Sequence, residues 1–172
     1  MTPAALHALL VAVAAARRPV VLIDGGAGAG KSTLAAQMID AWPGAEPAVV
    51  ICTDTICPGW DGLAAAAAAV PTLIRGGEVT SWDWEADRPG GPLAVDPRCP
   101  LIIEGCGAIT AASSELATLR VWVETPQDRR RERALARDGE IFAPHWQQWA
   151  DQEAEHWRRD RPRELADVVI DG

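Results

Sequence analysis

The chain has 172 residues, 48% of them hydrophobic, so it is long enough to form one domain (1–172) around a sizeable core. Its formal net charge of −8 argues against a nucleic acid partner, whose phosphates it would repel. No apolar run has the length of a membrane-spanning helix. We therefore expect neither a nucleic acid nor a membrane partner.

Residues 1–17 are rich in Ala, Leu and Val and are predicted to form a helix that packs on a sheet. A secretory signal peptide is the alternative, but the basic pair Arg17-Arg18 follows the apolar stretch instead of preceding it. We therefore expect a cytoplasmic protein.

A phosphate-binding loop follows the first predicted strand, 19–24. Residues 25–32 fit the pattern G-x-x-x-x-G-K-[ST], and a helix-prone segment (31–41) comes next. Glycines let the loop turn its N–H groups toward an anion, and the helix adds the positive end of its dipole. Lys31 should reach the β- and γ-phosphates, and the Ser32 hydroxyl should bind Mg²⁺. The predicted nucleotide contacts are Gly25, Gly26, Ala27, Gly28, Ala29, Gly30, Lys31, Ser32 and Thr33.

Four further apolar runs are predicted to be strands: 48–53, 100–104, 119–124 and 166–170. Helical stretches separate them. This repeated strand-then-helix order predicts an α/β fold, a parallel sheet with helices on both faces.

Two acidic residues stand at the carboxyl ends of these strands, where open α/β sheets place their ligand chemistry. Asp54 follows the strand at 48–53, and Glu104 ends the strand at 100–104. In P-loop proteins an acid at the place of Glu104 holds Mg²⁺ opposite the loop serine. Glu104 is therefore predicted to lie near the metal.

The segment 54–99 is predicted to be an insertion that faces the substrate. A helix should run over 62–70, with Pro71 breaking or restarting it. Residues 81–92 are polar, aromatic and rich in turn residues, without periodicity. They are either a loop that faces the substrate or a disordered tip, and two tryptophans around Asp83 favour the first.

The region 125–160 is predicted to hold an arginine-rich lid helix and a tryptophan-rich helix. Arg130, Arg133 and Arg137 fall at i, i+3 and i+7, so they share one helix face. In an acidic protein such a face is a candidate clamp for a transferring phosphoryl group. The alternative is a solvated charged helix. In both interpretations the helix is predicted to end at 138–139.

The tryptophan-rich helix should begin near Pro144. A stripe of residues recurs in it at helical spacing: Trp146, Trp149, Ala150, Glu153 and Trp157. Such a stripe indicates a helix face that packs against the core more than a ligand site. The three histidines, His7, His145 and His156, have no partner pattern and are predicted to be surface or capping residues. The four cysteines, Cys52, Cys57, Cys99 and Cys106, lack zinc spacing and are predicted to be buried thiols, not metal ligands or disulfides.

In their order along the chain, these motifs resemble uridine kinase and its relatives in the nucleoside and nucleotide kinase group of P-loop proteins. The resemblance covers residues 18–172 and rests on the phosphate loop, Asp54, 58–63, 82–85, 103–105, 123–125, and Arg130, Arg133 and Arg137-Asp138. In uridine kinases an aromatic pair follows the strand-end acid, whereas Thr55-Ile56 stands here.

The resemblance implies a three-layer P-loop NTPase fold with a five-stranded parallel sheet in the order 2-3-1-4-5, ATP as donor, and Mg²⁺. It implies that Asp54 is the base for the acceptor hydroxyl, close to the metal. The residues implied at the phosphates are Lys31, Arg133 and Arg137, and those expected at the acceptor are Asp83, Trp60, Trp84 and Arg130.

The sequence thus predicts a small-molecule kinase that transfers the γ-phosphoryl group of ATP to a hydroxyl, with a nucleoside such as uridine as one acceptor. Two alternatives stay open: an ATPase or nucleotide switch that acts on a partner, and a non-catalytic nucleotide-binding module. Either a monomer or a homodimer is compatible with the sequence, which has no heptad pattern.

Overall fold

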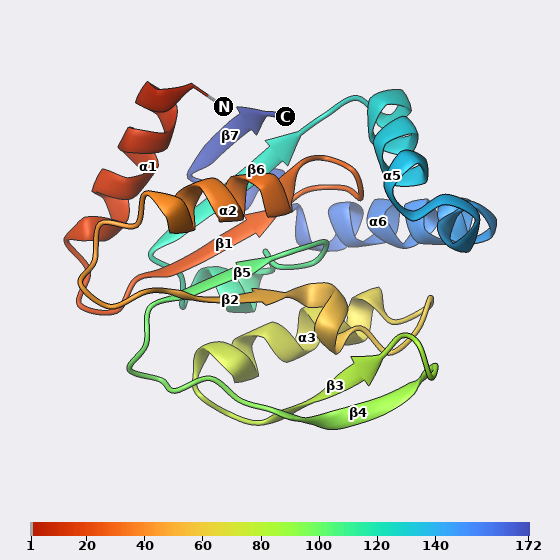
Figure 1. Cartoon of the computed structure of the whole chain (residues 1–172), viewed down its shortest axis with the longest axis horizontal. Coiled ribbons are helices and arrows are strands. Elements are labelled where there is room, and N and C mark those ends of the chain that lie inside the picture. The colour runs from red at the N-terminus through yellow and green to blue at the C-terminus, as the bar shows by residue number, and fades with distance from the viewer. Residues whose placement is uncertain (1) are drawn as a thin grey trace.

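The computed structural model describes residues 2–172 and contains a five-stranded parallel sheet with helices on both faces (Figure 1). The strands are β1 (Val20–Asp24), β2 (Val49–Cys52), β5 (Leu101–Glu104), β6 (Leu119–Glu124) and β7 (Val168–Asp171). Their order is β2-β5-β1-β6-β7, and every pairing between them is parallel. The predicted order is therefore confirmed, since β3 and β4 belong to a separate hairpin.

The helices are α1 (Pro3–Ala14), α2 (Lys31–Asp40), α3 (Leu63–Ile74), α4 (Ala111–Ser114), α5 (Gln127–Phe142), α6 (Trp146–Asp160) and α7 (Pro162–Leu165), with short 3-10 helices η1 (Thr53–Ile56) and η2 (Ala143–His145). The predicted N-terminal helix is found as α1, although residue 1 lies outside the described residues. Among residues 2–172 no helix is both long and apolar enough to cross a bilayer.

Two apolar cores lie on opposite faces of the sheet, because successive side chains of a strand alternate between its faces. Val21 and Ile23 of β1 belong to the core that α1 and α2 cover. Val20 and Leu22 belong to the core that α3 and α6 cover. This double burial explains why the central strands are continuous apolar runs.

Residues 81–92 are neither an irregular loop nor a disordered tip. They lie in an antiparallel hairpin of β3 (Val79–Asp83) and β4 (Arg88–Leu93), which Figure 1 shows outside the main sheet and next to α3. β4 was not predicted from the sequence because it contains two prolines and two glycines. Both residue types are depleted in strands. A two-stranded ribbon tolerates them because β4 is an edge strand.

Pro71 does not break the helix that contains it, contrary to the prediction. α3 runs without interruption from Leu63 to Ile74, with Pro71 buried inside it. The helix ends before Gly76, whose φ of 78° leaves the helical region. In α5 the backbone is interrupted at Gly139 (φ 55°, ψ −134°), where the sequence predicted the end of the arginine helix.

Candidate functional site

The loop at 25–30, between β1 and α2, has the backbone conformation of an anion cradle. Gly28 (φ 77°) and Gly30 (φ 104°) adopt the left-handed region that glycine favours. A Cβ at Gly28 would collide with the backbone carbonyl of Arg130, so the position has no space for a larger residue. Strand, glycine loop and helix follow one another as the motif requires.

Lys31 is the first residue of α2, and its side chain folds back over the loop. Its Nζ donates to the carbonyl oxygen of Gly26 at 3.0 Å and lies 3.5 Å from the Sγ of Cys106. Burial by itself lowers the pKa of Lys31, but the negative charge of neighbours such as Glu153 and Glu104 outweighs burial and raises it. The ammonium is therefore a permanent positive charge beside the loop.

Ser32 and Glu104 meet across the same end of the sheet, as predicted for a Mg²⁺ site. The Ser32 hydroxyl donates to Oε1 of Glu104 at 2.9 Å. Both are hard oxygen donors and so fit Mg²⁺. Within residues 2–172 no group of three or more His, Cys, Asp or Glu side chains could hold a metal. A Mg²⁺ in a phosphate site needs fewer protein ligands, because water and phosphate oxygens complete its shell.

A cleft of about 1040 Å³ brings together predicted residues that lie far apart in the sequence. Lys31 and Ser32 line it from the loop side, Asp54 and Glu104 from the strand ends, and Arg137 from α5. Asp54 belongs to η1, directly after β2, and is exposed. Its carboxylate is therefore accessible to a molecule in the cleft.

The three arginines of the predicted clamp occupy three different environments. Arg137 lines the cleft and forms an ion pair with Asp138 at 2.7 Å. Arg133 is exposed and lines a second pocket. Arg130 is buried beneath the loop and does not line the cleft. A shared helix face therefore does not bring these side chains to one ligand.

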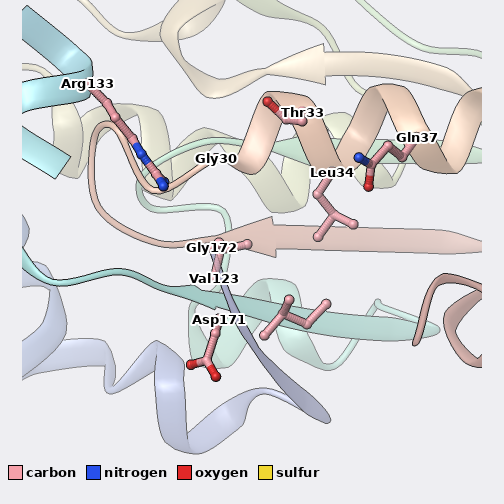
Figure 2. Close-up of a pocket in the computed structure, with 9 residues that line it drawn as sticks. Gly30, Thr33, Leu34, Gln37, Val123, Arg133, Asp171 and Gly172 are labelled. Carbon is pink, nitrogen blue, oxygen red and sulfur yellow. The ribbon is translucent and has the colours of Figure 1, made fainter. Parts of the chain in front are cut away.

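The second pocket has a volume of about 330 Å³ and lies on the other side of the loop, against α2 and β7. Figure 2 shows Arg133 extending from α5 toward Gly30, with Leu34 and Val123 on the apolar walls and Gly172 beside the strand end. Thr33 also lines it, so the pocket continues from the predicted phosphate contacts. The sequence did not indicate this pocket, because its walls come from four separate segments.

Arg130 and Glu153 form a buried ion pair that supports the loop from below. The Nη1 of Arg130 lies 2.9 Å from Oε2 of Glu153, and the side chains are 6% and 1% exposed. Arg130 also donates to the Ala27 carbonyl, and Oε1 of Glu153 accepts from the Ala27 N–H at 2.6 Å. The Arg130 guanidinium is thus engaged inside the protein, which gives it a bracing role in place of the predicted acceptor contact.

The sequence contained one indication of the Arg130–Glu153 pair. An acidic residue stood on the otherwise apolar face predicted for α6. The prediction that the stripe packs is confirmed for Trp146 and Trp149, which are buried. Glu153 shares that face, and a buried charged residue normally requires a partner. The partner could not be identified from sequence, since Arg130 lies on another helix.

Replacing Glu153 with glutamine should lower the unfolding free energy by about 3–5 kcal/mol, because Arg130 would keep a buried charge without its partner. Urea unfolding measures this change. The matched control is Glu155→Gln on the same helix. Glu155 pairs with Arg158 at the surface, where their side chains are 53% and 74% exposed, so we expect a loss below about 1 kcal/mol. Equal losses in the two variants would contradict the bracing role.

His156 is buried, and the prediction of a surface or capping role is wrong for it. The side chain is 1% exposed, with Nε2 at 3.3 Å from Asp24 and Nδ1 at 2.9 Å from Asp160. Asp24, at the end of β1, also accepts from the backbone N–H groups of Gly25 and Ile109. This cluster ties α6 to the start of the phosphate loop.

The His156 cluster should make stability depend on pH. Burial by itself lowers the pKa of His156, but hydrogen bonds and charges from Asp24 and Asp160 outweigh burial and raise it above 6.5. The stabilisation is then complete below the unfolded-state pKa and is lost as pH rises through the raised folded-state pKa. We therefore expect the difference in unfolding free energy between wild type and His156→Gln to shrink from about pH 6 upward. A difference independent of pH would exclude the ion pair.

Two tryptophans form the wall of the cleft next to Asp54. Trp60 and Trp84 both line the cleft, with ring centroids 5.0 Å apart and planes at 64°. The Nε1 of Trp84 donates to the Asp54 carbonyl oxygen at 2.8 Å, which ties the hairpin to η1. His145 stacks on Trp60 with centroids 4.1 Å apart, so Trp60 is held in place from the α6 side.

Asp83 does not line the cleft, although the sequence predicted an acceptor contact for it. Its Oδ1 accepts from the N–H groups of Glu85 and Ala86, so it caps the turn between β3 and β4. The acids of this turn that line the cleft are Glu85 and Asp87. Once the hairpin is formed, these two carboxylates line the cleft and Asp83 does not.

All four cysteines are free, and the prediction of buried thiols holds for Cys57 and Cys106. Cys52 and Cys99 are half-buried. Burial raises the pKa of Cys106, and burial together with Asp54 raises that of Cys57 to about 12. These two thiols are therefore neutral at physiological pH.

No protein-family model matches the chain, and no curated protein is significantly similar to it in sequence. Two solved structures are similar over nearly the whole length of both chains. A possible uridine kinase from Bacillus stearothermophilus has 17% identity and a TM-score of 0.65, covering 96% of this chain and 97% of its own. A protein assigned as a fructose transport system kinase from Silicibacter sp. has 19% identity and a TM-score of 0.57, covering 98% of each chain. The chain therefore shares the α/β fold of these two structures.

Proposed function

We propose that this protein is an ATP- and Mg²⁺-dependent kinase that transfers the γ-phosphoryl group of ATP to a hydroxyl of a small molecule. The observation that carries the proposal is one cleft lined by Lys31, by the Ser32–Glu104 pair and by Asp54. These groups supply a phosphate contact, oxygen donors for a metal, and a base. The similarity of fold to two proteins named as kinases supports this reaction class.

On the donor side, the N–H groups of the glycine loop bind the phosphates, and Lys31 neutralises the β- and γ-phosphates. Ser32 and Glu104 would hold Mg²⁺, which would supply further positive charge at the phosphates. The pocket beside Gly30 and Thr33 accepts the rest of the nucleotide, with Arg133 above it. Arg137 also lines the cleft from α5, where it pairs with Asp138.

On the acceptor side, Asp54 accepts the proton of the acceptor hydroxyl. The hydroxyl oxygen then forms a bond to the γ-phosphorus while the bond between that phosphorus and the bridging oxygen breaks, and ADP leaves. Trp60 and Trp84 provide the apolar surface against which a flat acceptor such as a nucleoside can lie. Uridine is one acceptor of this kind.

The test is ADP release from Mg-ATP across nucleosides, nucleoside monophosphates, sugars, vitamins and aminoglycosides. Release that depends on an acceptor and disappears in the Asp54→Asn variant would support a kinase. ATP binding without any dependence on an acceptor would contradict it and favour an ATPase, a nucleotide switch or a non-catalytic binding module.

A further inference from the structure

The acceptor half of the cleft has an excess of negative charge. Asp54, Glu85 and Asp87 line it, and all three are exposed carboxylates. Among residues 2–172 the cationic side chains in the lining are Lys31 and Arg137. Lys31 is engaged by the phosphate loop and Arg137 by Asp138, which lines the cleft as well. Asp54, Glu85, Asp87, Glu104 and Asp138 thus line the cleft against these two cations, so carboxylates outnumber cations around an acceptor.

The aromatic wall is a separate observation about the same space. Trp60 and Trp84 meet at 64°, so their rings form a corner, not a parallel stack. The hydrogen bond from Trp84 to the Asp54 carbonyl holds this corner beside the carboxylate assigned as the base. Aromatic faces together with nearby carboxylates attract an organic ammonium, through the ring quadrupole and through charge.

The same surroundings disfavour an anionic acceptor. A phosphate or carboxylate on the acceptor would face Glu85 and Asp87, and like charges in contact are strongly unfavourable. A neutral acceptor would gain nothing from these carboxylates beyond hydrogen bonds. The overall charge of −8 also raises the local concentration of cations near the surface.

We propose that the hydroxyl acceptor of this cleft is an amino alcohol in the broad sense, a molecule with a positively charged amine remote from its reacting hydroxyl. The inference rests on the proposed kinase function and names the substrate class of that site. The amine binds against the corner of Trp60 and Trp84 and the carboxylates of Glu85 and Asp87. It keeps its protons and does not react, and the hydroxyl takes the phosphoryl group as described above.

The test compares acceptors that share a skeleton and differ in charge. The probes are para-(aminomethyl)benzyl alcohol, its N-acetyl derivative and para-(hydroxymethyl)benzoate, together with kanamycin and its N-acetylated form. N-acetylation keeps the skeleton and removes the positive charge. We expect kcat/KM for ADP release to be about tenfold higher, or more, for each amine than for its acetylated form. We expect the benzoate to be the poorest acceptor.

The double variant Glu85→Gln, Asp87→Asn tests whether the cleft carboxylates cause the preference. Its KM for the amines should rise about tenfold with kcat nearly unchanged, because these groups bind the acceptor away from the reacting atoms. Its KM for the neutral forms should stay the same. The matched control is Glu115→Gln, Asp128→Asn, which removes two exposed charges outside the cleft and should change neither value. High salt should reduce the amine preference of the wild type but not of the double variant.

The outcomes separate this inference from the proposed function. If acetylated or anionic acceptors are phosphorylated as well as the amines, the amine class is wrong while the kinase stands. If the double variant keeps the preference, the amine class stands but its binding by Glu85 and Asp87 is wrong. If no probe of any charge stimulates ADP release and the wider panel is also flat, the kinase proposal itself fails, and the amine class with it.

Discussion

Replacing Lys31 with alanine is expected to weaken ATP binding by about ten- to a hundredfold, which corresponds to the loss of one or two charge-assisted hydrogen bonds to phosphate. Turnover should fall further, because the same charge stabilises the transferring group. The raised pKa of Lys31 means that the effect should persist across the physiological pH range. Calorimetric titration with Mg-ATP measures the affinity, and ADP release measures the turnover.

Lys31 is the only lysine in the chain, so one probe can report on the loop directly. Reductive methylation with ¹³C-formaldehyde labels Lys31 and the amino terminus, and the dimethylated ammonium keeps its positive charge. We expect the Lys31 methyl signal to shift when Mg-ATP is added. Two results together would exclude the phosphate-loop interpretation: unchanged nucleotide affinity in the alanine variant, and no shift of the Lys31 methyl signal in the labelled wild type.

Replacing Asp54 with asparagine is expected to reduce turnover by about 10²–10⁴-fold while ATP affinity stays within a few-fold of wild type. Asparagine keeps the size of the side chain and its hydrogen-bonding capacity but cannot accept the hydroxyl proton. Asp54 is exposed, and its backbone carbonyl, not its carboxylate, holds Trp84. The fold should therefore be unaffected, which circular dichroism and thermal unfolding can verify.

The control for Asp54→Asn is Asp40→Asn, an exposed aspartate at the end of α2 outside the cleft. It should have wild-type turnover and affinity. Near-normal turnover in Asp54→Asn would remove the base from the mechanism and leave Asp54 a metal or structural role. A loss of ATP affinity equal to that in Lys31→Ala would point to the metal role, since Mg²⁺ accompanies the nucleotide.

The fold was largely predictable from local patterns. Strands that are buried on both faces must be apolar along their whole length, so β1 and β5 stand out as continuous runs. A strand followed by glycines, Lys31 and Ser32 defines the loop with its neighbours, and the repeated strand–helix order requires a parallel sheet. The hairpin at 79–93 was missed because its stability comes from packing on η1 and α3, not from strand propensity.

The chemistry at strand ends was also predictable, since parallel strands bring their carboxyl ends to one edge. The order of the segments along the chain is therefore enough to place Asp54, Glu104 and Ser32 together. The roles of the arginines could not be predicted in this way, because they depend on how α5 and α6 pack against each other. That packing brings Arg130 of α5 to Glu153 of α6.

By itself, the sequence determined the glycine loop, the parallel sheet and the two acids at the strand ends that line the cleft, because each depends on the periodicity and order of short segments. Only the tertiary structure decided what lies under and around them. The pairing of Arg130 with Glu153, the burial of His156 against Asp24, and the replacement of Asp83 by Glu85 and Asp87 in the cleft lining all join segments distant in the chain. Such contacts depend on the packing of α6 and the hairpin against the sheet, and no local pattern records that packing.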